Sequence, residues 1–135
     1  MGNWLISAWE RIEKAFLVNG RYAAYLNGFK TTLIISLFAV LLGVAVGLIL
    51  AIIKYTANHV EKNIILTLLN WIANIYIGII RGTPVYVQLL IIYFVIFGSR
   101  DINKVIVAIF AFGINSGAYV AEIIRSGIMS IDVGQ

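Results

Sequence analysis

Long apolar runs separated by short polar segments dominate the chain. Uncharged stretches cover residues 31–53, 82–99 and 105–121. The first exceeds the ~20 residues that a helix needs to cross a bilayer, and the others reach that length with a turn of flanking sequence. Apolar residues are continuous within each run, which favours helices over the alternating strands of a membrane barrel. We therefore predict an all-α membrane protein with about three spans, at residues 30–54, 84–98 and 104–124.

The N-terminal residues have a different pattern. A helix is predicted at residues 4–16, because their large apolar residues share one helical face. These residues are Leu5, Trp9, Ile12 and Phe16. A tryptophan-rich amphipathic helix is typical of the membrane interface, and the segment lacks the apolar core of a signal peptide. We predict residues 1–28 as an interfacial segment and residues 29–135 as one membrane domain.

Small residues form a stripe along the first span and another along the third. The stripes contain Ala39, Gly43, Gly47 and Ala51, and then Gly113, Gly117 and Ala121. In lipid, close contact through small side chains is what brings helices together. Each stripe therefore predicts tight packing against another helix, and this interpretation is favoured over glycines that line a pore.

Polar residues also recur at helical spacing within residues 63–81. The stripe consists of Asn63, Thr67, Asn70, Asn74, Gly78 and Arg81. Trp71 and Tyr76 lie on the apolar remainder, and both residue types are typical of the headgroup region. We expect a helix that lies in the interface or enters the membrane obliquely.

An elbow is predicted where this helix meets the middle span, at Arg81-Gly82-Thr83-Pro84. Arg81 is the only charged residue within residues 64–99 and can reach a headgroup or a wet crevice. Gly82 permits a turn, Thr83 is a good N-cap, and Pro84 suits the first position of a new helix.

Four polar residues are candidates for lining a solute pathway. Asn115, Tyr119 and Glu122 share one face of the third span, and Gln88 lies in the middle span. Such side chains cost free energy in a membrane unless they meet partners or water. Two structural alternatives remain open: Glu122 pairs with Arg125 one turn along, and Gln88 bonds to another helix.

The amino-acid composition favours a membrane protein over a soluble protein, a nucleic-acid-binding protein or a metalloenzyme. The 135 residues are 61% hydrophobic and 12% charged, more apolar than a soluble domain of this length could bury. The net charge of +4 is carried at segment ends, which fits contact with membrane lipid better than binding of nucleic acid. With no cysteine, one histidine (His59, in a polar loop) and no Gly-Lys dipeptide, no metal site, cofactor or catalytic centre is predicted.

Two stretches resemble signatures of the membrane subunits of polar amino acid ABC importers. The first is Arg81-Gly82-Thr83-Pro84 followed by Val87-Gln88-Leu89 and Ile92-Tyr93-Phe94. The second is Gly117-Ala118-Tyr119 with Ala121-Glu122-Ile123, Arg125-Ser126-Gly127-Ile128 and Gly134-Gln135. The Thr31-Thr32-Leu33 opening of the first span fits as well, so that the resemblance extends from about residue 25 to the end.

The resemblance implies a multi-pass permease subunit in the bacterial cytoplasmic membrane, with a partial type I ABC importer fold. It also implies an identical or different second permease subunit, an ATPase subunit that carries out all ATP hydrolysis, and an extracytoplasmic binding protein. In this family Gly134-Gln135 leads into a Glu-Ala-Ala coupling helix. We therefore expect an N-terminal part of a permease, or a truncated product.

The sequence leaves alternatives open for the orientation of the chain in the membrane and for its function. The family places the N-terminus outside and residues 54–62 inside, whereas the distribution of basic residues favours the opposite orientation. We follow the family. The alternative functions are a small self-associating membrane pore and a non-functional truncated permease fragment.

Overall fold

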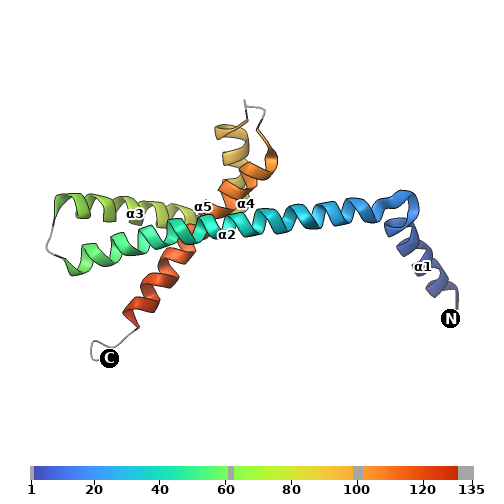
Figure 1. The fold of residues 1–135 in the computed structure, drawn as a ribbon, viewed down its shortest axis with the longest axis horizontal. Helices are drawn as coiled ribbons and strands as arrows, with labels where there is room; N and C mark the ends of the chain where they lie inside the picture. Colours follow the sequence, from blue (N-terminus) through green and yellow to red (C-terminus); the bar gives the residue numbers. More distant parts are fainter. Residues whose placement is uncertain (1, 61–62, 99–101, 131–135) are drawn as a thin grey trace. The chain divides into compact units, whose positions relative to one another are not determined.

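The computed structural model describes residues 2–60, 63–98 and 102–130, and all regular secondary structure in these ranges is helical (Figure 1). The elements are α1 (Gly2–Phe16), the 3-10 turn η1 (Val18–Gly20), α2 (Arg21–His59), α3 (Ile64–Gly82), α4 (Val85–Ile91), the π-helical turn η2 (Ile92–Ile96) and α5 (Lys104–Met129). The prediction of an all-α protein is thus confirmed.

The chain divides into two compact units, residues 1–34 and residues 35–135. The first unit contains α1, which confirms the helix predicted at residues 4–16. Gly20 ends η1 with a φ of 66°, a conformation that glycine adopts without steric cost. The Phe16 and Tyr25 ring centroids lie 4.8 Å apart on either side of this turn.

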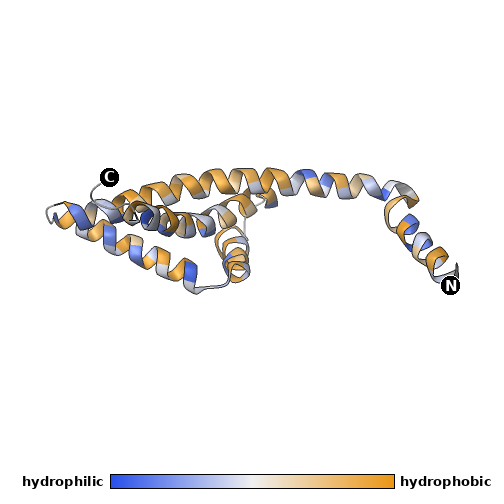
Figure 2. Ribbon diagram, turned by 90° about the horizontal axis from the view of Figure 1, so that it is seen from below, coloured by the Kyte–Doolittle hydropathy of each residue, from blue (hydrophilic) through white to orange (hydrophobic). Residues whose placement is uncertain are grey.

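Within the described residues, three helices are long and apolar enough to cross a bilayer: α2, α3 and α5. The predicted number of about three spans is confirmed, but by length and composition the candidates are not the same three segments. The helix at Val85–Ile96 is too short, whereas α3, expected at the interface or at an oblique angle, has 19 residues and qualifies. The polar stripe of α3 occupies one face only, so that its mean hydropathy stays high; the polar positions along α3 are visible in Figure 2.

Within residues 35–135 the burial pattern is the reverse of that in a soluble protein. The buried apolar residues are mostly alanines, with Ile77 and Val107 as larger exceptions. Large side chains such as Leu37 and Phe38 are more than half exposed, at 59% and 52%. Figure 2 shows how strongly apolar residues predominate along α2. An exposed apolar surface of this kind is suited to lipid.

Helices α2 and α5 cross in direct contact through their small residues. Ala39, Gly43, Gly47 and Ala51 are the buried residues of α2, and Gly113, Gly117 and Ala121 are among those of α5. A Cβ atom added at Gly43 would lie 2.7 Å from the Cβ of Ser116, and one added at Gly47 would lie 2.6 Å from the Cβ of Val120. Both predicted stripes therefore pack tightly, and each is the partner of the other.

The elbow after α3 is confirmed, but its capping residues are not those predicted. Thr83 is the C-cap of α3, and its hydroxyl donates to the Ile79 carbonyl at 2.8 Å. Pro84 is the N-cap of α4 rather than its first residue, and it makes no side-chain capping bond. Because α4 begins at Val85, Thr83 lies one residue before its N-cap, and its hydroxyl bonds to the Ile79 carbonyl and the Gln88 amide instead of to the first turn of α4.

Candidate functional site

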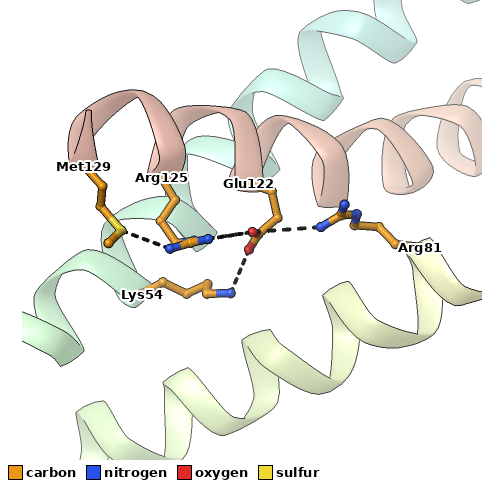
Figure 3. Close-up of polar contacts among 5 residues, drawn as sticks. All are labelled: Lys54, Arg81, Glu122, Arg125 and Met129. Carbon is orange, nitrogen blue, oxygen red and sulfur yellow. Dashed lines mark hydrogen bonds and ion pairs between the residues drawn. The ribbon is translucent and has the colours of Figure 1, made fainter. Parts of the chain in front are cut away.

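Three cations from three helices surround the Glu122 carboxylate (Figure 3). Lys54 of α2 donates to Oε1 at 2.7 Å. Arg125 of α5 donates to Oε2 from Nη2 at 3.0 Å and from Nε at 3.3 Å. Arg81 of α3 is more distant, with Nη1 3.9 Å from Oε2. We call Lys54, Arg81, Glu122 and Arg125 the Glu122 cluster.

The Glu122 cluster is partly shielded from solvent. The side chains of Lys54 and Glu122 are only 14% and 19% exposed. Removing such charges from water is costly unless they are paired and hydrogen-bonded, and both conditions are met here. The arrangement joins the end of α2 to α5 by a hydrogen bond, and Arg81 adds a longer electrostatic contact from the end of α3.

Sequence reasoning found only part of this cluster. The predicted pairing of Glu122 with Arg125 is confirmed, at a spacing of three residues. The partner on α2, Lys54, was missed, because it lies 68 residues away in the sequence and no local pattern links it to Glu122. The only available signal was that both residues sit at the ends of predicted spans.

An open pocket lies beside the cluster, on the same side as Arg81. It has a volume of about 410 Å³ and is lined by Arg81, Tyr119, Glu122, Ile123 and Ser126. The Arg81 guanidinium carbon is 5.6 Å from the centroid of the Tyr119 ring, a distance that allows a cation–π interaction. The Arg81 side chain is 45% exposed, whereas that of Glu122 is 19% exposed. The pocket therefore presents a cation, two hydroxyl groups and a carboxylate that is already paired.

Gln88 and Asn115 belong to a second polar group, at the elbow. Gln88 is 8% exposed, and its Nε2 lies within 2.7–2.9 Å of the Ile80 carbonyl, the Thr83 carbonyl and the Thr83 hydroxyl. Its Oε1 accepts from Nδ2 of Asn115 at 3.1 Å. Of the two roles considered for Gln88, the structure gives it the bond to another helix. We call Gln88, Thr83 and Asn115 the elbow network.

Tyr76 makes a contact that sequence reasoning did not anticipate. Its hydroxyl donates to the Ile114 carbonyl of α5 at 2.5 Å, and it lies beside Gly117. A side chain at Gly117 would come within 3.3 Å of this hydroxyl. Tyr76 therefore connects α3 to α5.

The four predicted pathway residues thus fall into two groups. Tyr119 and Glu122 line the open pocket, and Gln88 and Asn115 bond to each other in the elbow network. Among the described residues, no group of three acidic or histidine side chains is placed to hold a metal ion. The chemistry available at this site is binding of polar or charged groups.

Comparison with known proteins identifies relatives over most of the chain. No protein-family model matches it. It is 45% identical over 112 residues to GlnP, a permease protein of Rickettsia prowazekii (strain Madrid E) named for a glutamine transport system; the match covers 82% of this chain and 48% of that protein. It is 36% identical over 112 residues to the arginine transport system permease protein ArtQ of Bacillus subtilis (strain 168), again covering 82% and 48%.

A solved structure is similar as well. The chain superimposes on a crystal structure of an amino acid ABC transporter with histidines, with a TM-score of 0.71 and 39% identity. This match covers 88% of the chain and 53% of that structure's chain. The chain spans about half the length of the relatives it matches. It is therefore a homologue of the membrane permease subunits of amino acid ABC transporters, with their all-helical, multi-span fold over that half.

Proposed function

We propose that the chain forms part of the translocation pathway of a bacterial importer for polar amino acids, as a permease subunit in the cytoplasmic membrane. The proposal includes a second permease subunit, identical or different, an ABC ATPase and an extracytoplasmic binding protein. ATP hydrolysis takes place on the separate ATPase, because permease subunits are non-catalytic. The homology to permeases named for glutamine and arginine transport supports this assignment.

One structural observation carries the proposal: a pocket with charged and hydroxyl groups opens between two apolar helices, α3 and α5, that are long enough to cross a bilayer. Arg81, Tyr119, Glu122 and Ser126 provide these groups. Polar and ionisable residues within membrane segments are expensive, and they mark solute pathways in membrane proteins. In this proposal Tyr119 and Glu122 contact the solute. Gln88 and Asn115 hold the helices behind them.

Transport would follow from motion of the whole subunit relative to its partner. The ATPase cycle drives the two membrane halves between inward-open and outward-open arrangements, and this chain contributes one wall of the pathway. The Glu122 cluster keeps α2, α3 and α5 together during such a motion. The chain's own side chains perform no covalent chemistry in this scheme.

Uptake measurements test the function. The chain is produced with an ATPase and a binding protein of the amino acid importer class, in a bacterial strain that lacks its own uptake of glutamine and arginine. We expect saturable uptake of one of these radiolabelled amino acids, and loss of that uptake when the P-loop lysine of the ATPase is replaced. Uptake that persists without a working ATPase would contradict the proposal.

The rival function, a self-associating pore, was suggested by the two glycine stripes. These stripes pack against each other within the chain, at the crossing of α2 and α5. The feature that suggested self-association is therefore used internally. Ion conductance by the purified chain in planar bilayers, without an ATPase, would revive this function.

A further inference from the structure

Arg81 is the one cation of the Glu122 cluster that does not donate a hydrogen bond to the carboxylate within the described part of the chain. Its closest approach to Glu122 is 3.9 Å, beyond hydrogen-bonding distance. Glu122 already accepts one bond from Lys54 and two from Arg125. Neutralisation of Glu122 therefore does not require Arg81, and the guanidinium donors remain available to another acceptor.

Arg81 lines the pocket, so that a ligand there can reach its guanidinium group. The Tyr119 ring, 5.6 Å from the guanidinium carbon, supports one face of the group. Tyr119 and Ser126 line the same pocket and carry the two hydroxyl groups that could donate beside it. The elements bring together a planar cation from α3 and two neutral donors from α5.

The charge balance of the cluster indicates which ligand would fit. Three cations face one carboxylate, so that the cluster carries two excess positive charges. This excess makes the pocket electropositive, which favours an anionic ligand over a neutral or cationic one. A guanidinium binds a carboxylate through two parallel hydrogen bonds, a geometry that a single-point cation cannot offer.

We propose that this pocket binds the carboxylate of an amino acid, with Arg81 as the principal ligand and the Tyr119 and Ser126 hydroxyls as additional donors. The identity of the carboxylate carrier as an amino acid rests on the proposed function. The anion site itself rests only on the geometry of Arg81 and the pocket. Arg81 is then a ligand-binding residue rather than only an anchor at the end of α3.

The phosphate group of an anionic lipid has similar chemistry and is the competing source of a negative charge. A lipid headgroup and a soluble carboxylate can be distinguished by the composition of the surrounding bilayer. The test therefore uses the purified full chain in nanodiscs of phosphatidylcholine, and again in nanodiscs containing phosphatidylglycerol. L-glutamine is the probe, and L-glutaminamide, which lacks the carboxylate, is the matched comparison.

We expect L-glutamine to bind the wild-type chain at least about tenfold more tightly than L-glutaminamide, since a charge-assisted bidentate pair is lost with the amide. Arg81→Gln should reduce glutamine affinity about tenfold or more and bring the preference over the amide close to one. Arg81→Lys should retain only part of the wild-type preference for glutamine over glutaminamide. Lys30→Gln removes a positive charge outside the pocket and should leave both affinities unchanged.

Helicity measured by circular dichroism establishes whether each variant folds. If Arg81→Gln does not fold, Tyr119→Phe and Ser126→Ala replace it, because each removes a single hydroxyl group and should weaken glutamine binding severalfold. An unchanged preference for glutamine over glutaminamide in the folded variants would overturn the proposal. Arg81-dependent binding of phosphatidylglycerol without any glutamine binding would overturn it in favour of a lipid site.

The outcome separates this inference from the proposed function. If the wild-type chain supports ATPase-dependent uptake but Arg81→Gln keeps the same preference for the carboxylate, only the carboxylate site is refuted. If the chain binds glutamine through Arg81 but supports no uptake, the site is upheld and the transport function fails.

Discussion

At the scale of single residues, Glu122 is the shared partner of the ion pairs with Lys54, Arg81 and Arg125. Its two carboxylate oxygens accept hydrogen bonds from α2 and from its own helix. The exposed fractions of Lys54 and Glu122, 14% and 19%, leave little water to replace a lost partner. Removal of one partner from such a pair therefore leaves an uncompensated charge.

Replacement of Glu122 should be destabilising and should be rescued by removal of a cation. Glu122→Gln removes the negative charge that opposes Lys54, and we expect a loss of about 1–3 kcal/mol in unfolding free energy, below the 3–5 kcal/mol of fully buried pairs. The double variant Glu122→Gln with Lys54→Met should recover part of this loss. Thermal or denaturant unfolding in detergent, followed by circular dichroism, measures both effects.

Glu13→Gln is the matched control, since it removes an exposed carboxylate of α1 and should change stability very little. A double variant that is less stable than Glu122→Gln alone would show that the Lys54 charge is not the source of the penalty.

At the elbow, Gln88 is the residue whose side chain connects the polar groups of α3, the bend and α5. Gln88→Leu keeps a similar side-chain volume but removes all hydrogen bonds that the Gln88 amide makes. It also leaves the Asn115 amide without its acceptor. We expect a loss of about 1–3 kcal/mol, the usual cost of an unsatisfied buried polar group. Asn115→Leu should lower the unfolding free energy less in the Gln88→Leu variant than in the wild-type chain. Strictly additive losses in this double-mutant cycle would contradict a direct Gln88–Asn115 interaction.

The sequence predicted part of the polar structure at this scale. It predicted the pairing of Glu122 and Arg125, because a helix brings residues three or four apart together. It named Gln88 and Asn115 separately but could not pair them, since they lie 27 residues apart on different helices. It assigned Thr83 to the start of α4, whereas Thr83 is the C-cap of α3 and its hydroxyl bonds to the Ile79 carbonyl and the Gln88 amide, neither of which a local pattern specifies.

At the scale of helices, the contact between α2 and α5 depends on the absence of side chains at a few positions. At Gly47 an added Cβ would come within 2.6 Å of Val120 and 3.0 Å of the Ala121 backbone nitrogen. At Gly113 it would come within 2.5 Å of Leu42. Neither helix can accept a larger residue there without moving away from the other.

Gly47→Ala should therefore destabilise the fold, while Gly28→Ala in the same helix should not. The first change overpacks the crossing, at a cost of about 1–3 kcal/mol. The second adds a methyl group where no atom lies within 4 Å, and it should be neutral or stabilise the helix by up to about 1 kcal/mol. Unfolding midpoints of the two variants, measured side by side, compare the effects. Equal midpoints would contradict close packing at Gly47.

Helices were predicted more reliably than their roles. The continuous apolar runs indicated α2 and α5, and the small-residue stripes indicated that both pack closely. The stripes could not name each other as partners, since many helices offer small residues. The interfacial or oblique placement of α3 stays a prediction, and the sequence did not indicate that the Tyr76 hydroxyl of α3 bonds to α5.

At the scale of the whole molecule, the orientation in the membrane is the main prediction that follows from the family. The family orientation places the N-terminus outside and the segment between α2 and α3 inside, against the distribution of basic residues. The chain has no cysteine, so any introduced cysteine is the only thiol available for labelling.

Ser7→Cys and His59→Cys provide two such reporters, one in α1 and one at the end of α2. We expect a membrane-impermeant maleimide added to intact cells to label Ser7→Cys, and to label His59→Cys only after the membrane is permeabilised. The reverse pattern would show that the basic residues, rather than the family, determine the orientation. Labelling of both variants in detergent serves as the control for reagent access.

The bend at Thr83 and Pro84 could be read as a hinge. The side-chain amide of Gln88, which bonds to residues on both sides of the bend, is evidence against this interpretation. One buried glutamine joins the last turn of α3, the bend itself and α5, so that a change of bend angle would break several hydrogen bonds at once. Flexing at the proline is thus disfavoured. Any rearrangement that opens a passage has to displace α3, α4 and α5 as one rigid block.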